Sequence, residues 1–273
     1  MINNSSLKPI KSQLINGDID WSFTKEWINH NPFDAPCSEK LSKIQSTKLK
    51  KINFIYPTVD IQQRNYPLLY PGGQIPCVEC NIIKDTNEHV GLCSSHTGDI
   101  LKIMIDHEKI LLDIIKNEIS NNDYMLEASI NGSRLFDRSF NGGLPSDHPF
   151  YLLIHYLVPC DLTEIFYNYI PKKKLRFNTF NKFMNILMET IDTNIWNRRN
   201  KHVKDWEKSL SITKIKKKFY HRRYRKNNDS FTSHNDTPQS NARRTYTHRH
   251  ITTTPYNKLG GFCTTLDGLR EIF

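Results

Sequence analysis

CVECNIIKDTNEHVGLC, residues 77–93, contains three of the chain's six cysteines and one histidine. Cys77 and Cys80 form a Cys-x2-Cys pair, whose tight turn lets two thiolates reach the same ion. His89 and Cys93 are four residues apart and therefore share one face of a helical turn. Three thiolates and one imidazole complete a tetrahedron and leave no position open for water. The spacing predicts a structural Zn²⁺ site that staples the fold and performs no hydrolysis.

Two alternatives to this ligand set are open in the sequence. His96 could replace His89 as a ligand, although the position of His89 beside Glu88 fits the spacing to Cys93 better. The reduced cysteines could also have come together by chance. The metal spacing differs from that of the retroviral zinc knuckle, which has four residues between its second Cys and its His, so we do not expect a nucleocapsid-like RNA knuckle.

Composition limits the kind of protein. The 273-residue chain carries a net charge of +10 with a pI near 9.2, a balance that favours polyanionic partners. Its N-terminus lacks the charged start and apolar run of a secretory signal, and no stretch approaches the ~18 apolar residues of a membrane span. We therefore expect an intracellular protein without membrane contact, in which clustered cysteines act as metal ligands rather than disulfides.

Hydrophobic periodicity predicts a mainly α structure. Strong helices are expected over 98–119 and 178–210, whereas the apolar run 149–160 is ambiguous between a buried helix and a strand. A further helix over 41–55 is amphipathic and ends before Pro57. Its apolar side holds Leu41, Ile44, either Lys48 or Leu49, Ile52 and Ile55, and the other sides hold Lys43, Lys48, Lys50 and Lys51. We predict a small zinc-stapled helical domain followed by a disordered basic C-terminal tail.

The chain divides into five segments by composition. Residues 1–20 are polar and expected to be flexible, and residues 21–118 are expected to form the zinc-binding domain with its metal loop at 77–93. A loop region, 119–148, rich in Asn, Ser, Asp and Gly, precedes a helical region, 149–212. The last segment, 213–273, begins with many basic residues and continues with very few aliphatic side chains. This composition predicts a largely disordered tail.

The positive charge is concentrated near the start of this tail. Residues 198–226 hold 13 Lys and Arg against two acidic residues, so this segment carries the chain's whole positive excess. Within it, KIKKKFYHRRYRK, residues 214–226, interleaves cations that bind phosphates with aromatic rings that stack on unpaired bases. The residues expected to contact RNA or DNA are Lys214, Lys216, Lys217, Lys218, Tyr220, Arg222, Arg223, Tyr224, Arg225 and Lys226. The same run fits a nuclear localisation signal, and a merely solvated helix end is the plainer alternative.

Three further sequence features lie near the candidate metal ligands or downstream of them. They are Pro57-Thr58 after the basic helix, the acidic-Thr-x-Glu-His run from Asp85 to His89, and the Trp-Asn-Arg-Arg-Asn helix from Trp196 to Asn200. Together with the four ligands they resemble the zinc-binding domain that follows the polymerase in reverse transcriptases of non-LTR retrotransposons. The resemblance covers about a third of the chain, well over 41–115 and loosely at Trp196. It departs at Tyr56, where the family usually has Leu, and residues 119–180 match nothing in the family.

Catalytic motifs are absent from the sequence. It contains no Asp-Asp pair, which a polymerase palm needs to hold two metal ions, and no phosphate-binding loop, His-Glu-x2-His or Gly-x-Ser-x-Gly motif. We therefore predict no enzyme activity and no catalytic residue. The leading hypothesis is a retrotransposon-derived zinc-binding module that binds nucleic acid through the 198–226 arm and the Lys43–Lys51 helix. The alternative is a zinc-stapled protein-protein interaction module in which the apolar stretch 149–170 meets a partner.

Overall fold

The structure, a computed structural model, describes residues 4–33, 38–119, 124–140 and 142–220. Regular structure in these ranges is helical, with strand-like pairing limited to the isolated bridges Ile19–Pro159 and Pro76–Lys84. The prediction of a mainly α protein is confirmed. In chain order, the helices are η1 (Ser5–Ile10), α1 (Lys11–Asn16), α2 (Trp21–Asn29), α3 (Glu39–Ile52), α4 (Val59–Asn65), α5 (Asn87–Leu92), η2 (Ser94–His96), α6 (Thr97–Glu118), α7 (Tyr124–Asn131), η3 (Arg134–Phe136), α8 (Pro149–Ile154), α9 (Cys160–Tyr169), α10 (Lys173–Ile191), the π-helical turn η4 (Asp192–Asn197), α11 (Arg198–Ser209) and α12 (Lys214–Lys218).

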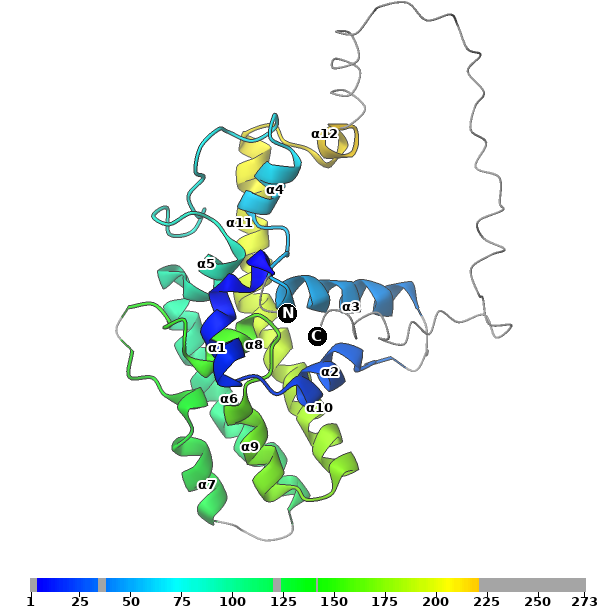
Figure 1. Ribbon diagram of the computed structural model, residues 1–273, viewed down its shortest axis with the longest axis vertical. Helices are drawn as coiled ribbons and strands as arrows, with labels where there is room; N and C mark the ends of the chain where they lie inside the picture. Colours follow the sequence, from blue (N-terminus) through cyan, green and yellow to red (C-terminus); the bar gives the residue numbers. More distant parts are fainter. Residues whose placement is uncertain (1–3, 34–37, 120–123, 141, 221–273) are drawn as a thin grey trace, which may run out of the picture.

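A long rod organises the molecule. Helix α10 continues through η4 into α11, so the single helix predicted over 178–210 is present with one π-helical turn inside it. In the lower half of Figure 1, α10 packs with α6 and α9, and α7 packs beside α6 and α9. Helix α11 extends above this bundle, where α4 and α12 lie beside its far end.

One hydrophobic core joins segments that the composition separates. The ring of Phe23 in α2 packs edge-on against Phe180 in α10, with centroids 4.7 Å apart. Leu126 and Leu135, from the predicted loop region 119–148, are fully buried in the same core. The predicted boundaries near 119 and 149 therefore do not divide the core. A second, smaller group, here called the upper cluster, packs at the far end of α11 and comprises Val59, Tyr70, Ile75, Val203 and Ile212.

The N-terminal residues are packed rather than flexible. Ile10 is fully buried and Ile19 is 4% exposed. The side-chain amide of Gln13 donates a hydrogen bond to the carbonyl of Ser146 at 2.6 Å. The prediction of a flexible segment over 1–20 is wrong for its described part, residues 4–20, because the buried Ile10 and Ile19 and the Gln13 hydrogen bond hold it against the rest of the protein.

Two lysines of α3 point into the protein, contrary to the prediction. Lys48 is 4% exposed, donates to the carbonyl of Trp27 at 2.7 Å and lies 3.6 Å from the centre of its ring. Lys51 is 2% exposed and binds the Asp192 carboxylate and, at 3.1 Å, the Tyr156 hydroxyl. Burial lowers the pKa of Lys48 to about 8 and also lowers that of Lys51. Helix α3 therefore cannot offer its whole lysine set to nucleic acid.

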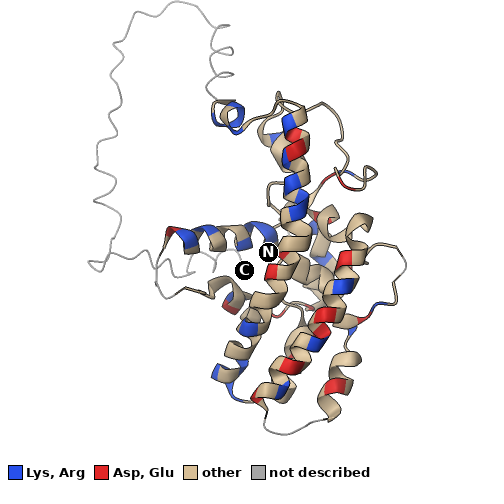
Figure 2. Cartoon of the chain, turned by 180° about the vertical axis from the view of Figure 1, so that it is seen from behind, with Lys and Arg blue, Asp and Glu red and all other residues tan. Residues whose placement is uncertain are grey.

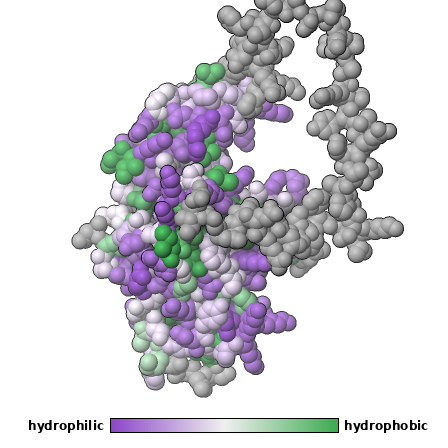
Figure 3. Space-filling view, viewed as in Figure 1, coloured by the Kyte–Doolittle hydropathy of each residue, from purple (hydrophilic) through white to green (hydrophobic). Residues whose placement is uncertain are grey.

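The surface seen in Figure 3 is mainly hydrophilic, with hydrophobic residues in small separate areas. None of the described helices combines the length and apolarity needed to cross a membrane. The first residues of the predicted tail, 213–220, are ordered instead, because α12 forms and Tyr220 is only 6% exposed. Residues 221–273 lie outside the described part of the chain.

Candidate metal centre

The first two ligands come from a tight hairpin between residues 75 and 85. The amide of Cys77 donates to the carbonyl of Ile83 at 2.8 Å, and the amide of Asn81 donates to the carbonyl of Cys77 at 2.8 Å. Asn81 has a φ of 56°, a left-handed conformation that Asn tolerates better than most residues. This turn brings Cys77 and Cys80 to the same side, as the Cys-x2-Cys spacing predicts.

The other two ligands come from α5. Thr86 caps this helix, since its hydroxyl accepts a hydrogen bond from the amide of His89 at 3.1 Å. One helical turn later Cys93 ends the helix in an extended conformation. His89 and Cys93 therefore face the hairpin from one side of a single turn.

The four side chains converge on a common centre. Their ligand atoms all lie within 4.8 Å of one another, with Cys77 Sγ and Cys93 Sγ 4.0 Å apart and Cys80 Sγ and His89 Nε2 3.3 Å apart. A tetrahedral site with metal–ligand distances of about 2.0–2.3 Å has edges of roughly 3.5–3.8 Å, close to these separations. Cys77, Cys93 and His89 are buried, and Cys80 is half-buried. The group Cys77, Cys80, His89 and Cys93 could thus hold a metal ion, and chance clustering does not account for such convergence.

Crowding of the thiols changes their acidity. A hydrogen bond from Cys93 is the main cause that lowers the pKa of Cys77 to about 3, and the same contact raises the pKa of Cys93 well above its ordinary value. Burial lowers the pKa of His89, but contacts with Cys77 and Cys80 outweigh it and raise that pKa overall. A metal cation bound at this centre would replace the protons that these side chains share.

His96, the alternative ligand, is engaged elsewhere. Its Nδ1 lies 2.8 Å from the carbonyl of Val90, and its Nε2 lies 2.5 Å from the carboxylate of Glu79. Both ring nitrogens are therefore occupied by oxygen partners. The choice of His89 over His96 agrees with this geometry.

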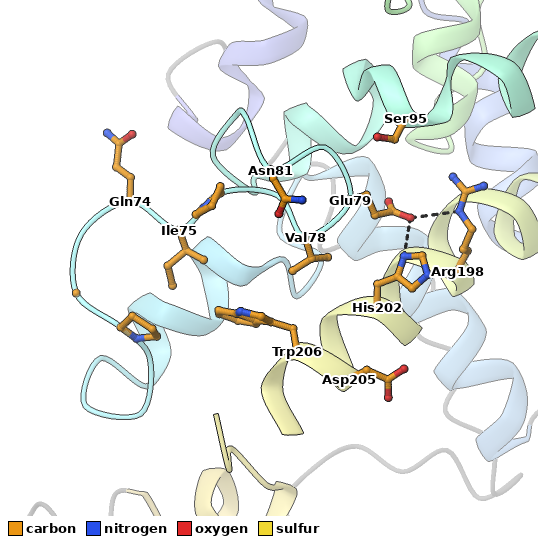
Figure 4. A pocket seen from close by; sticks show the side chains of 13 residues that line it. Gln74, Ile75, Val78, Glu79, Asn81, Ser95, Arg198, His202, Asp205 and Trp206 are labelled. Carbon is orange, nitrogen blue, oxygen red and sulfur yellow. Dashed lines mark hydrogen bonds and ion pairs between the residues drawn. The ribbon is translucent and has the colours of Figure 1, made fainter. Parts of the chain in front are cut away.

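Glu79, inside the Cys-x2-Cys pair, ties the metal loop to α11. Its carboxylate contacts His96, Arg198 Nε at 3.2 Å and His202 Nδ1 at 3.0 Å, as the dashed lines in Figure 4 show for the last two. Burial raises the pKa of Glu79, but these hydrogen bonds and charges outweigh it and lower the pKa to about 2. Arg198 also binds Asp99 at the start of α6. Sequence analysis assigned no role to Glu79, although a carboxylate between two candidate ligand cysteines was a usable signal.

A second ion pair joins the metal loop to α11. Asp85 and Arg199 are 0% and 1% exposed and pair through both carboxylate oxygens, with Arg199 Nε 3.2 Å from Oδ1. Asp85 Oδ2 also accepts the amide of Val59 at the start of α4, at 2.9 Å. The first two arginines of the predicted nucleic-acid arm are therefore held by carboxylates of the protein.

Residues next to Pro57, in α5 and around Trp196 also meet beside this pair. The side-chain amide of Asn87 donates to Thr58 Oγ1 at 2.9 Å, and that of Asn200 donates to the Tyr56 hydroxyl at 2.8 Å. The Trp196 indole packs edge-on against Tyr56, with centroids 4.8 Å apart. Residues that are far apart in the sequence thus form one contact region around the metal loop.

The predicted nucleic-acid contacts have different environments. Lys214 and Lys218 are exposed and Lys216 is half-exposed. Lys217 instead binds both oxygens of Glu207 at 2.8 and 2.9 Å, and Tyr220 packs edge-on against Tyr66 with centroids 5.4 Å apart, so its ring is not free to stack on a base. The last five predicted contacts lie outside the described residues: Arg222, Arg223, Tyr224, Arg225 and Lys226.

Comparisons with known proteins return no relative. No protein-family model matches the chain, and no match was found among curated proteins or among solved structures.

Proposed function

We propose that this protein is a zinc-binding module, without catalysis of its own, that binds RNA or DNA through lysines of α11 and α12. The observation that carries the proposal is the convergence of three thiols and one imidazole, within 4.8 Å, at the side of α11, a helix with five Lys and Arg residues. Thiolate and imidazole ligands in a tetrahedral arrangement favour Zn²⁺ over Mg²⁺ or Ca²⁺, which prefer oxygen ligands. A full set of four protein ligands assigns the ion a structural role.

Lysines on the outer side of α11 supply the expected contact surface. Lys201, Lys204 and Lys208 are exposed and follow one another at spacings of three and four residues, so they share a face of the helix. Lys208 pairs with Asp205 at 2.8 Å, but its side chain is still 75% exposed. Figure 2 shows Lys and Arg gathered along α11 and on α12 beside its end. Lysines on such a face can neutralise phosphates and release the counterions condensed on the nucleic acid, which favours binding.

The origin proposed for the module is a non-LTR retrotransposon reverse transcriptase. The support is that Asp85, which begins the acidic-Thr-x-Glu-His run, pairs with Arg199 of the Trp196–Asn200 segment, so two parts of the pattern 114 residues apart are in contact. Such a module would be a separated part of a larger polyprotein.

In the alternative, a protein-protein interaction module, the apolar stretch 149–170 would contact the partner. Most apolar side chains there are inside the core, for example Phe150, Leu153 and Phe166 at 0% exposed. No specific observation in the described residues therefore favours it.

Metal content and salt dependence test the proposal together. Purified protein should contain one zinc per chain, and the Cys80→Ser and His89→Ala variants should lose it. Changing Lys201, Lys204 and Lys208 to Gln should weaken nucleic-acid binding and reduce the slope of log affinity against log salt by about 2–3. A matched control changes the exposed Lys172, Lys173 and Lys174 at the opposite end of the rod, removing the same charge. Equal losses in both triple variants would mean that net charge, and not this face, binds the polyanion.

A further inference from the structure

A groove opens beside the metal loop, along α11. Its volume is about 790 Å³, and its walls are α11, the loop 71–76 and the Cys-x2-Cys turn (Figure 4). The α11 residues that line it include Arg198, His202 and Trp206, which recur every four residues and so form one stripe of the helix. The groove therefore lies along the same helix that carries the exposed lysines. The α11 residues that line the groove and the exposed lysines form adjacent stripes on the surface of that helix.

One part of the groove is apolar and aromatic. Trp206 is half-buried, and Figure 4 shows its indole beside Ile75 and Val78. The Tyr70 ring supports it, with centroids 6.2 Å apart and planes tilted by 37°. A ring held in this way is a fixed platform, because its orientation does not have to be ordered when a ligand arrives.

The charged part of the groove is already neutralised by internal pairs. The Glu79 carboxylate binds His96, Arg198 and His202, while Arg198 also binds Asp99. Asp205, also in the lining, is paired with Lys208 at 2.8 Å. A phosphate inside the groove would meet no unpaired arginine, so the charge favours a neutral occupant.

Polar groups without an internal partner lie in the same lining. Asn81 and Ser95 line the groove, and no hydrogen bond within the described residues uses their side chains. A carboxamide and a hydroxyl can each donate and accept, as the edge of a nucleobase requires. A flat neutral group with a polar edge therefore fits an indole platform and these two side chains.

We propose that this groove receives one unpaired nucleobase of a single strand whose phosphates lie along Lys201, Lys204 and Lys208. The inference rests on the nucleic-acid binding proposed above and adds to it a preference for unpaired over paired bases. A base in a duplex is stacked and paired, so it cannot enter a groove of this kind without being extruded at a cost in free energy. Both RNA and DNA offer the required base, and the test distinguishes them.

The test compares Trp206→Ala with wild type on four fluorescent probes: a uridine 12-mer, a thymidine 12-mer, and 12-base-pair duplexes of RNA and DNA. Trp206→Ala should weaken binding to at least one single strand by about 5- to 150-fold, the range that stacking of one base on an aromatic ring supplies. Duplex affinity and the salt slope should stay within twofold of wild type, since the lysines are unchanged. Trp206→Phe, which keeps an aromatic platform, should restore most of the single-strand affinity.

Controls separate this inference from the proposed function. Trp21→Ala removes an indole that is 39% exposed on α2 and should change no probe's affinity. Zinc content and circular dichroism should match wild type in every variant. If wild type binds strands but Trp206→Ala weakens single strands and duplexes equally, or weakens neither, the groove proposal is overturned while nucleic-acid binding stands. If wild type binds none of the four probes, the proposed function itself is overturned.

Discussion

Replacing Arg199 with Met is expected to lower the free energy of unfolding by about 3–5 kcal/mol, because it leaves a buried carboxylate without its counter-charge. Asp85 is fully buried, and Arg199 is its only paired cation among the described residues. After the substitution, the Asp85 carboxylate keeps one hydrogen bond from the described residues, donated by the Val59 amide at 2.9 Å. Two unit charges ~4 Å apart interact by about 4 kcal/mol at an effective dielectric constant of ~20, which agrees with the expected loss.

The assay is urea-induced unfolding of each variant at fixed zinc concentration, with metal content measured alongside. The double variant Asp85→Asn with Arg199→Met removes both charges and keeps an acceptor for the Val59 amide, so it should recover at least 2 kcal/mol of the loss. Lys182→Met serves as a control, because Lys182 pairs with Glu118 at 2.6 Å while 61% exposed and should cost less than about 1 kcal/mol. A loss below about 1 kcal/mol for Arg199→Met, or no recovery in the double variant, would refute the reasoning.

Three further predictions concern pH, packing and the metal. Complete burial lowers the pKa of His155 to about 3, below the unfolded value of about 6.5, so the unfolded chain binds the extra proton as pH falls. Stability from this group is full above about pH 6.5 and is lost on acidification; between pH 7.5 and 5 the loss is about 2 kcal/mol, and His155→Leu should remove that part of the pH dependence in urea titrations. Gly91→Ala places a Cβ 2.6 Å from the Tyr151 ring and should cost about 1–3 kcal/mol, whereas Gly98→Ala meets nothing within 4 Å and should be neutral or stabilising; equal melting temperatures for the two variants would contradict this. Chelation of the metal should speed amide hydrogen exchange over 75–93 while α6 and α10 stay protected by their own core, and uniform acceleration would show that the metal holds the whole fold.

Local spacing was enough to predict the ligand set and most of the helices. Cys77 and Cys80 are brought together by one turn, and His89 and Cys93 by one helical turn, so each pair is encoded within a few residues. The same holds for α6, whose buried residues recur at helical spacing. Hydrophobic periodicity reports such local geometry directly, because it depends only on the rise and rotation per residue.

The tertiary structure decided which charges are free to meet a partner. Lys48 and Lys51 read as exposed lysines of an amphipathic helix but lie in the core, held by groups from α2 and from the turn η4. Arg199 reads as part of a basic arm but pairs with Asp85, 114 residues away. A local pattern records that a side chain is charged and not whether a distant carboxylate neutralises it. For that reason local sequence patterns were enough to predict the candidate metal ligands and the helical content, whereas the packing of α11 against the loop 77–93 separated the lysines that remain exposed from the arginines that hold the fold.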